Sequence, residues 1–290
     1  MQIIERDRLL FLGAPGSGKS QAIVDVATLL PDVKVYAFDM QDSILPLLRA
    51  VGEAPPNLVL YRIGGEPVEA WDEFQARCKE VRATVKPGDW VAFDVAADWW
   101  QLVQDAYIEK VYEAASCDFK EAKLMEAVEQ GAKTKKAPKK ALGFGGLEPD
   151  EWSVVKGKYY ITIPQTLSTR CTANIIVTAN EKTPAHWMRG DEMVFREANL
   201  PGQYKKNLVK PWGEANLTSQ VDVVLWLKHP TDKKWTLSTL GKNRFKVDFD
   251  DVDITSRTVW EVYCERLKRD PYRSPGFLDA PLPKKEKRAR

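Results

Sequence analysis

Apolar residues form short, uninterrupted runs along this chain, and several of the stretches between them show helical periodicity. Between residues 68 and 85, large apolar side chains recur at three- or four-residue steps, as in an amphipathic helix. The short runs are rich in β-branched and aromatic residues, which predicts buried strands. They lie at residues 9–12, 32–40, 57–63, 90–94, 173–180 and 221–229. Strands that alternate with helices predict an α/β fold with a mostly parallel central sheet and helices on both faces.

The end of the chain follows a different pattern. Residues 234–249, KWTLSTLGKNRFKVDF, predict a C-terminal antiparallel strand pair with a turn around Gly241. A last helix is expected from about Ser256 to Lys268. Residues 271–290 are proline-rich and then basic, which is typical of a flexible tail.

The stretch between Asp98 and Trp152 does not fit the sheet pattern. Its first part has helical periodicity, and a basic insertion follows at about residues 117–150. Five lysines without an acidic neighbour stand in this insertion: Lys133, Lys135, Lys136, Lys139 and Lys140. They belong either to a solvated surface segment or to a loop that meets the phosphate backbone of a nucleic acid. The remainder of residues 1–270 is expected to form one core.

Composition excludes several classes of protein. The chain has 290 residues, and its net charge of +2 is too small to argue for a nucleic-acid partner without local clusters of cations. Its four cysteines are widely spaced and it has only two histidines, which argues against a disulfide framework or a zinc site. No apolar run approaches the roughly 20 residues that span a bilayer. We therefore expect a cytoplasmic protein that does not enter the membrane.

Residues 13–20 read GAPGSGKS and carry the clearest chemical signal in the chain. They fit the phosphate-binding pattern G-x-x-x-x-G-K-[ST], and they stand between a predicted strand and a predicted helix. Glycines allow the backbone to curl so that its N–H groups point at phosphate oxygens. Lys19 would reach the β- and γ-phosphates of ATP, and the Ser20 hydroxyl would bind Mg²⁺. The predicted phosphate site comprises Gly13, Ala14, Pro15, Gly16, Ser17, Gly18, Lys19 and Ser20.

A second acid is needed beside such a loop to hold the magnesium ion. Asp94 ends the apolar run WVAFD and is the predicted second metal ligand. Val95 follows it, so this chain lacks the adjacent acidic pair with which AAA+ ATPases and many helicases bind magnesium and activate water. The base that activates water must then come from another part of the sequence.

The stretch YAFDMQDS at residues 36–43 resembles the RecA-like ATPases, the group that includes bacterial RecA and the DnaB helicases. In that group, the strand after the phosphate-loop helix ends in a glutamate that polarises the attacking water. The alignment puts Gln41 in this place, and glutamine orients water but cannot take its proton. Three explanations stay open: hydrolysis is slow, Asp42 or Asp39 substitutes, or the alignment is shifted by one residue.

The resemblance continues in ANIIVTANEK, where Asn180 matches the polar sensor residue near the γ-phosphate. The following residues, 182–212, match the second DNA-binding loop of the family in length and composition. Cations for phosphates and flat rings for bases are the chemistry of single-strand binding, although a charged surface with packed aromatic residues has the same composition. The expected DNA contacts here are Lys182, Arg189, Arg196, Lys205 and Lys206.

A late K-x-R pattern completes the resemblance. In RecA-like proteins, a lysine and a second cation two residues later reach from one subunit into the nucleotide site of the next. Lys242 and Arg244 match this pattern, and the resemblance implies that they stabilise charge on the γ-phosphate. On a strand, both side chains would share one face. The active site would then be complete only in a homo-oligomeric ring or filament.

Together these features indicate a RecA-like P-loop ATPase that uses ATP and Mg²⁺ and acts on single-stranded DNA in recombination, annealing or replication. The small size resembles the RecA-core recombination and annealing ATPases of phages. Two alternatives remain open. One is a motor that packages or remodels DNA, and the other is a P-loop kinase of a small molecule, although the insertion carries few of the arginines that a kinase lid needs.

Overall fold

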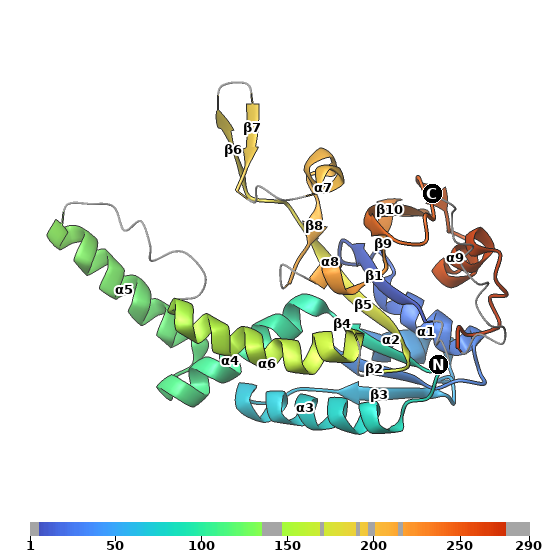
Figure 1. Ribbon diagram of the computed structural model, residues 1–290, viewed down its shortest axis with the longest axis horizontal. Coiled ribbons are helices and arrows are strands. Elements are labelled where there is room, and N and C mark those ends of the chain that lie inside the picture. Colours follow the sequence, from blue (N-terminus) through green and yellow to red (C-terminus); the bar gives the residue numbers. More distant parts are fainter. Residues whose placement is uncertain are drawn as a thin grey trace, which may run out of the picture.

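The structure is a computed structural model that describes residues 6–134, 147–168, 171–189, 192–196, 201–213 and 217–276. Within these residues, a nine-stranded mixed sheet has the order β11-β10-β9-β1-β5-β4-β2-β3, and β8 pairs with β5 (Figure 1). The sheet strands are β1 (Arg8–Gly13), β2 (Val35–Asp39), β3 (Leu58–Arg62), β4 (Trp90–Asp94), β5 (Asn174–Lys182), β8 (Lys210–Pro211), β9 (Val223–Thr231), β10 (Lys234–Asn243) and β11 (Val252–Asp253). Strands β1 to β5 and β9 run parallel, which confirms the predicted α/β class.

Helices cover both faces of the sheet. The helices are α1 (Lys19–Leu29), α2 (Ile44–Val51), α3 (Pro67–Thr84), α4 (Ala96–Tyr112), α5 (Ser116–Thr134), α6 (Pro149–Ser168), α7 (Gly202–Asn207), α8 (Leu217–Gln220) and α9 (Val259–Leu267). Side chains alternate along β1, so that Leu9 and Phe11 pack with α1 and α9, while Leu10 and Leu12 pack with α3, α4 and α6. The sheet therefore separates two apolar cores.

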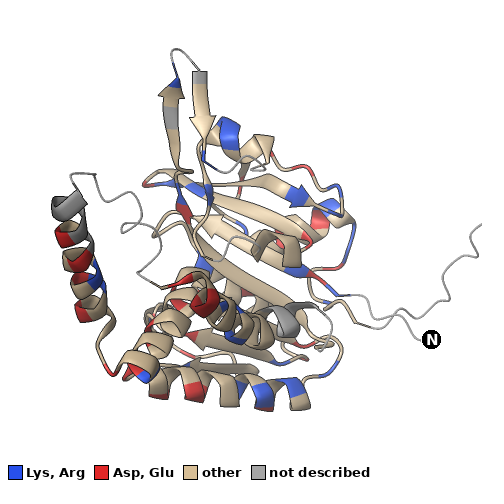
Figure 2. Cartoon of the chain, turned by 60° about the vertical axis from the view of Figure 1, so that its left-hand side comes forward, with Lys and Arg blue, Asp and Glu red and all other residues tan. Residues whose placement is uncertain are grey.

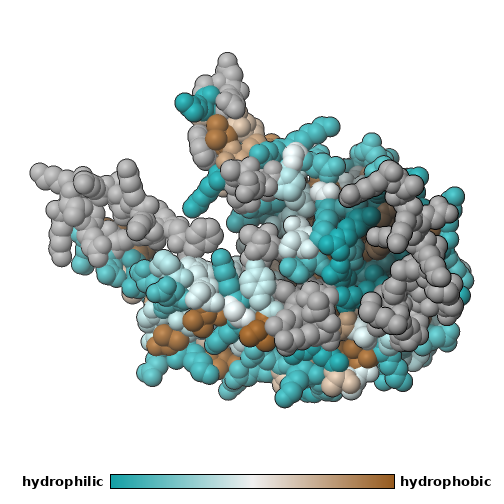
Figure 3. Space-filling model, viewed as in Figure 1, coloured by the Kyte–Doolittle hydropathy of each residue, from teal (hydrophilic) through white to brown (hydrophobic). Residues whose placement is uncertain are grey.

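Two parts project from this body. Helix α5 extends away from the sheet, and the strands β6 (His186–Arg189) and β7 (Glu192–Phe195) form an isolated antiparallel hairpin (Figure 1). The predicted helix after Asp98 is α4, and the basic insertion begins as α5. Figure 3 shows apolar side chains at the surface over α6 and on the hairpin, where Ile161 and Met188 are exposed. Within the described part of the chain, no helix combines the length and apolar character needed to cross a membrane.

The predicted turn around Gly241 is wrong. Strand β10 pairs antiparallel with β9 before it and with β11 after it, and the turn between β9 and β10 lies at Asp232 and Lys233. Gly241 lies inside β10, where the register with β9 is irregular, and its φ of +78° suits glycine. A Cβ atom on Gly241 would come within 2.5 Å of the Tyr204 hydroxyl oxygen. Gly241 thus does not form a turn. Its lack of a side chain allows the Tyr204 ring of α7 to pack against β10.

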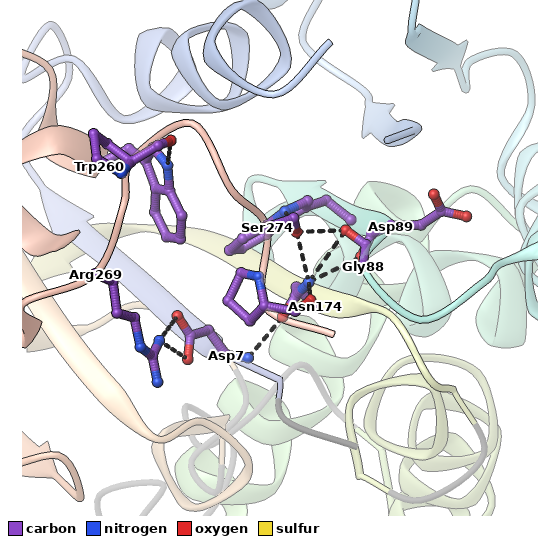
Figure 4. A network of polar contacts seen from close by, with 10 residues as sticks. Asp7, Gly88, Asp89, Asn174, Trp260, Arg269 and Ser274 are labelled. Carbon is purple, nitrogen blue, oxygen red and sulfur yellow. Dashed lines mark hydrogen bonds and ion pairs between the residues drawn. The ribbon is translucent and has the colours of Figure 1, made fainter. Parts of the chain in front are cut away.

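Residues 269–276, which include the start of the expected flexible tail, lie across the amino ends of the strands (Figure 4). The Asn174 side chain accepts a hydrogen bond from the Asp7 N–H at 2.8 Å and donates to the Pro275 carbonyl at 3.0 Å. Arg269 forms an ion pair with the fully buried Asp7 at 2.9 Å. Ser274 accepts from the Trp90 indole at 2.9 Å. Residues 277–290 lie outside the described part of the chain.

Candidate nucleotide site

The GAPGSGKS loop joins the carboxyl end of β1 to the start of α1, as its sequence predicts. Gly16 and Gly18 have φ values of +79° and +93°, a conformation that side chains disfavour. Gly13 is required for a different reason, because a Cβ atom there would come within 2.4 Å of the Leu227 carbonyl on β9. The Ser17 hydroxyl is buried and has no hydrogen-bond partner among the described residues. A curled loop with an unsatisfied hydroxyl fits an oxygen-rich ligand such as a phosphate.

Lys19 lies inside this loop rather than in solvent. Its ammonium donates to the carbonyl oxygens of Gly13 at 2.9 Å and Ala14 at 2.8 Å. Burial lowers the pKa of Lys19, whereas the nearby carboxylates of Asp94 and Glu181 raise it. A phosphate group at this position would supply the negative charge that favours the ammonium form.

Asp94 at the end of β4 accepts hydrogen bonds from three hydroxyl groups, one of which belongs to the phosphate loop. The Ser20 hydroxyl donates to Asp94 Oδ2 at 2.6 Å, and the hydroxyls of Ser43 and Thr178 donate to the same carboxylate. Asp94 is 1% exposed. Ser20 and Asp94, predicted as the metal ligands, are thus in direct contact. A hydroxyl and a carboxylate are hard oxygen donors, which fit Mg²⁺ when substrate phosphates and water complete its coordination.

Neither aspartate considered as a substitute for the missing glutamate has a free carboxylate. Asp39 caps the start of α2, since its two oxygens accept hydrogen bonds from the N–H groups of Gln41 at 3.0 Å and Ile44 at 2.9 Å. Asp42 is exposed and forms an ion pair with Arg62. Both aspartates therefore have structural partners, as expected for residues that end a strand and begin a helix.

The side chain of Gln41 acts on another acid, Asp98 in the first turn of α4, and lowers its pKa. Burial is the largest effect and raises this pKa, with further increases from Asp94 and Asp39, so that the pKa of Asp98 is about 6. Asp98 Oδ2 is buried and has no hydrogen-bond partner within the described residues.

Asn180 lies beside the phosphate loop, because β5 pairs with β1 in a register that places Asn180 opposite Gly13. Its carbonyl accepts a hydrogen bond from the Trp212 N–H at 2.8 Å, which ties β5 to the segment after α7. The next residue, Glu181, accepts from the Trp226 indole at 3.0 Å and is one of the carboxylates near Lys19. The position predicted for a sensor residue is therefore next to the loop.

Lys242 and Arg244 lie at the opposite end of the sheet. Arg244 forms an ion pair with Asp222 at 2.9 Å, and Arg8 at the start of β1 pairs with the same carboxylate at 2.7 Å. Because β1 rises about 3.3 Å per residue, Arg8 stands about 17 Å from Gly13. The two cations therefore do not contact the phosphate loop of their own chain. Lys242 donates to the Ser219 carbonyl, and burial lowers its pKa.

Of the two cations, only Lys242 lies within a strand. Strand β10 ends at Asn243, and Arg244 lies in the turn that follows. The N–H of Arg244 donates to the Asp222 carbonyl at 2.9 Å, which is the ladder hydrogen bond beside the antiparallel Asn243–Val223 pair. A shared face for the two side chains therefore stays a prediction.

The candidate DNA-binding residues between positions 182 and 206 lie at the end of β5, on the hairpin, just after β7 and on α7. Lys182 stands 5.6 Å from the ring centroid of Trp212, and Lys205 stands 5.8 Å from that of Phe195. Trp212 is 50% exposed. Figure 2 shows cations on α7 and near the tip of the hairpin, whereas acidic residues stand on several turns of the helix α5. Exposed positions also include Arg189, Arg196 and Lys206.

Residues 135–146 of the basic insertion lie outside the described part of the chain. Lys133 stands in the last turn of α5. Lys135, Lys136, Lys139 and Lys140 lie outside the described residues, so their part in DNA binding stays a prediction.

Four residues of the site were not predicted from the sequence: Ser43, Thr178, Asp98 and Glu181. Thr178 is a polar residue within the apolar run of β5, and Asp98 stands four residues after Asp94 at the start of an apolar helix. These polar exceptions in apolar segments were the available signals. Ser43 and Glu181 carry no comparable signal, because polar residues are ordinary at a helix N-cap such as Ser43 and near the end of a strand, where Glu181 lies.

A scan against protein-family models found no match to this chain, and a search of curated proteins found none.

Proposed function

We propose that this chain is an ATPase with a RecA-like core that acts on single-stranded DNA as a homo-oligomer. The observation that carries the proposal is the contact of Ser20 with Asp94 beside a phosphate loop of the expected conformation. This contact brings together the two groups that hold magnesium in P-loop ATPases. The proposal rests on this geometry and on the resemblance in the sequence.

The residues of the site have distinct roles in this proposal. The backbone of residues 13–18 and the Lys19 ammonium bind the β- and γ-phosphates, and the N-terminus of α1 favours their negative charge. Ser20 and Asp94 would hold Mg²⁺, which when bound would neutralise charge on the phosphates. Asn180 lies next to the loop and would sense whether the γ-phosphate is present.

An oligomer would complete the site. Lys242 and Arg244 stand at the amino end of the sheet, where they cannot reach the phosphates of their own chain. A second copy could present them to the phosphate loop of the first, as an arginine finger does. Their distance from the loop of their own chain supports action between subunits.

Single-stranded DNA binding is proposed for residues 182–212, here called the DNA-binding segment. It begins at Lys182, only two residues beyond Asn180, so it is continuous with the strand that borders the phosphate loop. Trp212 offers an exposed ring to an unstacked base, and the neighbouring lysines offer charge to phosphates.

The test of the DNA role is fluorescence anisotropy with a labelled oligothymidine at several salt concentrations. We expect the logarithm of the affinity to fall with the logarithm of salt concentration, with a slope of about −0.7 for each phosphate contacted. Replacement Trp212→Ala should weaken binding at least about fivefold, because base stacking contributes roughly 1–3 kcal/mol. Tyr272→Ala is the matched control, since Tyr272 is a 65% exposed ring outside the segment.

Binding that is independent of salt would contradict the DNA role. A preference for duplex DNA, with turnover stimulated by duplex alone, would favour the packaging or remodelling motor instead.

A further inference from the structure

The attacking water in ATP hydrolysis must lose a proton, and the residue that accepts it is the missing part of this site. The question rests on the proposed ATPase function. Four aspartates lie at the carboxyl ends of β2 and β4 or just beyond them: Asp39, Asp42, Asp94 and Asp98.

Three of them have other partners. Asp94 accepts hydrogen bonds from three hydroxyls, including the 2.6 Å bond from Ser20, and it is the expected metal ligand. Asp39 caps α2 through the N–H groups of Gln41 and Ile44. Asp42 faces solvent with Arg62. None of these three carboxylates is free to take a proton from water at the site.

Asp98 differs from them in one respect, which is its unsatisfied oxygen. Asp98 Oδ2 is excluded from solvent and has no hydrogen-bond partner among the described residues. Buried carboxylate oxygens are nearly always hydrogen-bonded, so an exception needs an explanation, and a catalytic role is one of the recognised ones. Asp98 lies in the first turn of α4, four residues after Asp94, and Asp94 is paired with Asp39 on the neighbouring strand β2.

Gln41 then has a role that its sequence position alone did not explain. It follows β2, at the place where the RecA-like proteins have glutamate, and its side chain interacts with Asp98. A glutamine cannot take a proton, but it can orient the carboxylate that does.

We propose that Asp98 is the general base of ATP hydrolysis in this chain and that Gln41 positions it. A water molecule transfers a proton to Asp98 Oδ2 as its oxygen forms a bond to the γ-phosphorus. The bond between the γ-phosphorus and the oxygen that bridges to the β-phosphate breaks, and its electron pair leaves with ADP. Asp98 afterwards releases the proton to solvent, so that the products are ADP and phosphate.

Asp98→Asn tests this assignment, because asparagine keeps the size of the side chain and removes its basicity. We expect kcat to fall at least about 100-fold, since a general base contributes 10²–10⁴-fold. Binding of a fluorescent ATP analogue with Mg²⁺ should change less than threefold. Formate should restore part of the turnover of Asp98→Ala, and it should not restore that of Asp94→Ala. Gln41→Ala should lower kcat with little change in KM.

Two further variants make the result specific. Asp42→Asn removes an exposed aspartate with no role in the site and should leave turnover unchanged. Glu181→Gln tests the other carboxylate near Lys19. Full activity of Asp98→Asn, or loss of turnover confined to Glu181→Gln, would overturn the assignment of Asp98 while leaving the ATPase proposal intact. Wild-type protein that binds ATP without hydrolysing it would overturn both.

Discussion

The Ser20 hydroxyl donates a hydrogen bond to Asp94 Oδ2 at 2.6 Å, although the two residues are 74 positions apart in the sequence. Ser20 lies in the first turn of α1, and Asp94 is the last residue of β4. Strand β5 lies between β1 and β4, and its Thr178 bonds to the same carboxylate. The sheet thus brings a glycine-rich loop and a buried acid together at the carboxyl ends of its parallel strands.

The trans action of Lys242 and Arg244 can be tested by mixing subunits. A Lys242→Ala, Arg244→Ala double variant should bind ATP normally and lose at least about 100-fold in turnover, because an arginine finger contributes 10³–10⁵-fold. Arg8 still pairs with Asp222 in this variant, so the local fold should persist. Mixing it with Lys19→Ala protein, which keeps both cations but lacks a working phosphate site, should restore turnover.

Phosphate release measured on the separate and mixed proteins gives the answer. Wild-type turnover by the double variant, or no recovery after mixing, would contradict action between subunits.

Asp25 on α1 predicts a pH dependence of stability that is independent of any ligand. Burial raises the pKa of Asp25 from 3.8 to about 6, against the effect of a hydrogen bond from Gln21, and Glu261 on α9 raises it further. The folded protein therefore holds this proton more tightly than the unfolded chain. This stabilising effect is complete below the unfolded pKa of 3.8 and is lost as the pH rises to about 6.

Replacement Asp25→Asn removes the charge that burial disfavours. It should raise the free energy of unfolding at pH 7.5 by up to about 3 kcal/mol, since each pKa unit corresponds to about 1.36 kcal/mol, and it should have a smaller effect at pH 4.5. Urea denaturation at both pH values measures the difference. Asp32→Asn is the control, because Asp32 is exposed. Equal effects of the Asp25 replacement at both pH values would exclude Asp25 as the titrating group.

The Asn174 network predicts a stability effect far from the phosphate loop. Asn174 is fully buried and links β1, the turn before β4 and the segment at residues 274–275 (Figure 4). Asn174→Ala leaves the Asp7 N–H and the Pro275 carbonyl without this partner. We expect a loss of about 3 kcal/mol in the free energy of unfolding, because each buried group left unsatisfied costs about 1–3 kcal/mol.

Chemical denaturation of Asn174→Ala measures this loss, with Tyr272→Ala as an exposed control in the same C-terminal segment. A change below about 0.5 kcal/mol in Asn174→Ala, the range of ordinary surface replacements, would show that the segment does not stabilise the fold.

Local patterns predicted the parts of this protein that depend on neighbouring residues. The phosphate loop follows from the spacing of Gly13, Gly18 and Lys19, and Asp94 follows from its place at the end of an apolar run. Position in space was harder to predict. The carboxylate of Asp39 is occupied because it accepts from the N–H of Ile44 at the start of α2. The Asp98 oxygen lacks a partner because of the direction that α4 takes after β4. No local sequence pattern predicts either arrangement.

Gly241 shows the same limit in the backbone. A glycine between apolar runs predicts a turn, because turns often need a positive φ. Here the positive φ serves an irregular position inside β10, where the N–H of Gly241 donates to Gln203 and the ring of Tyr204 packs closely. The contact comes from α7, more than thirty residues earlier, and so it could not be predicted from the strand itself.

The proposed ATPase activity is tested by the Mg²⁺-dependent binding and hydrolysis of ATP by the 290-residue protein. We predict that the wild type binds ATP with Mg²⁺ and releases phosphate. Lys19→Ala should bind about 100-fold more weakly, because it loses charged hydrogen bonds of roughly 1.5–3 kcal/mol each. Lys79→Ala, which removes an exposed lysine on α3, should behave as the wild type. Equal ATP binding by Lys19→Ala and the wild type, or no ATP binding by either, would contradict the account.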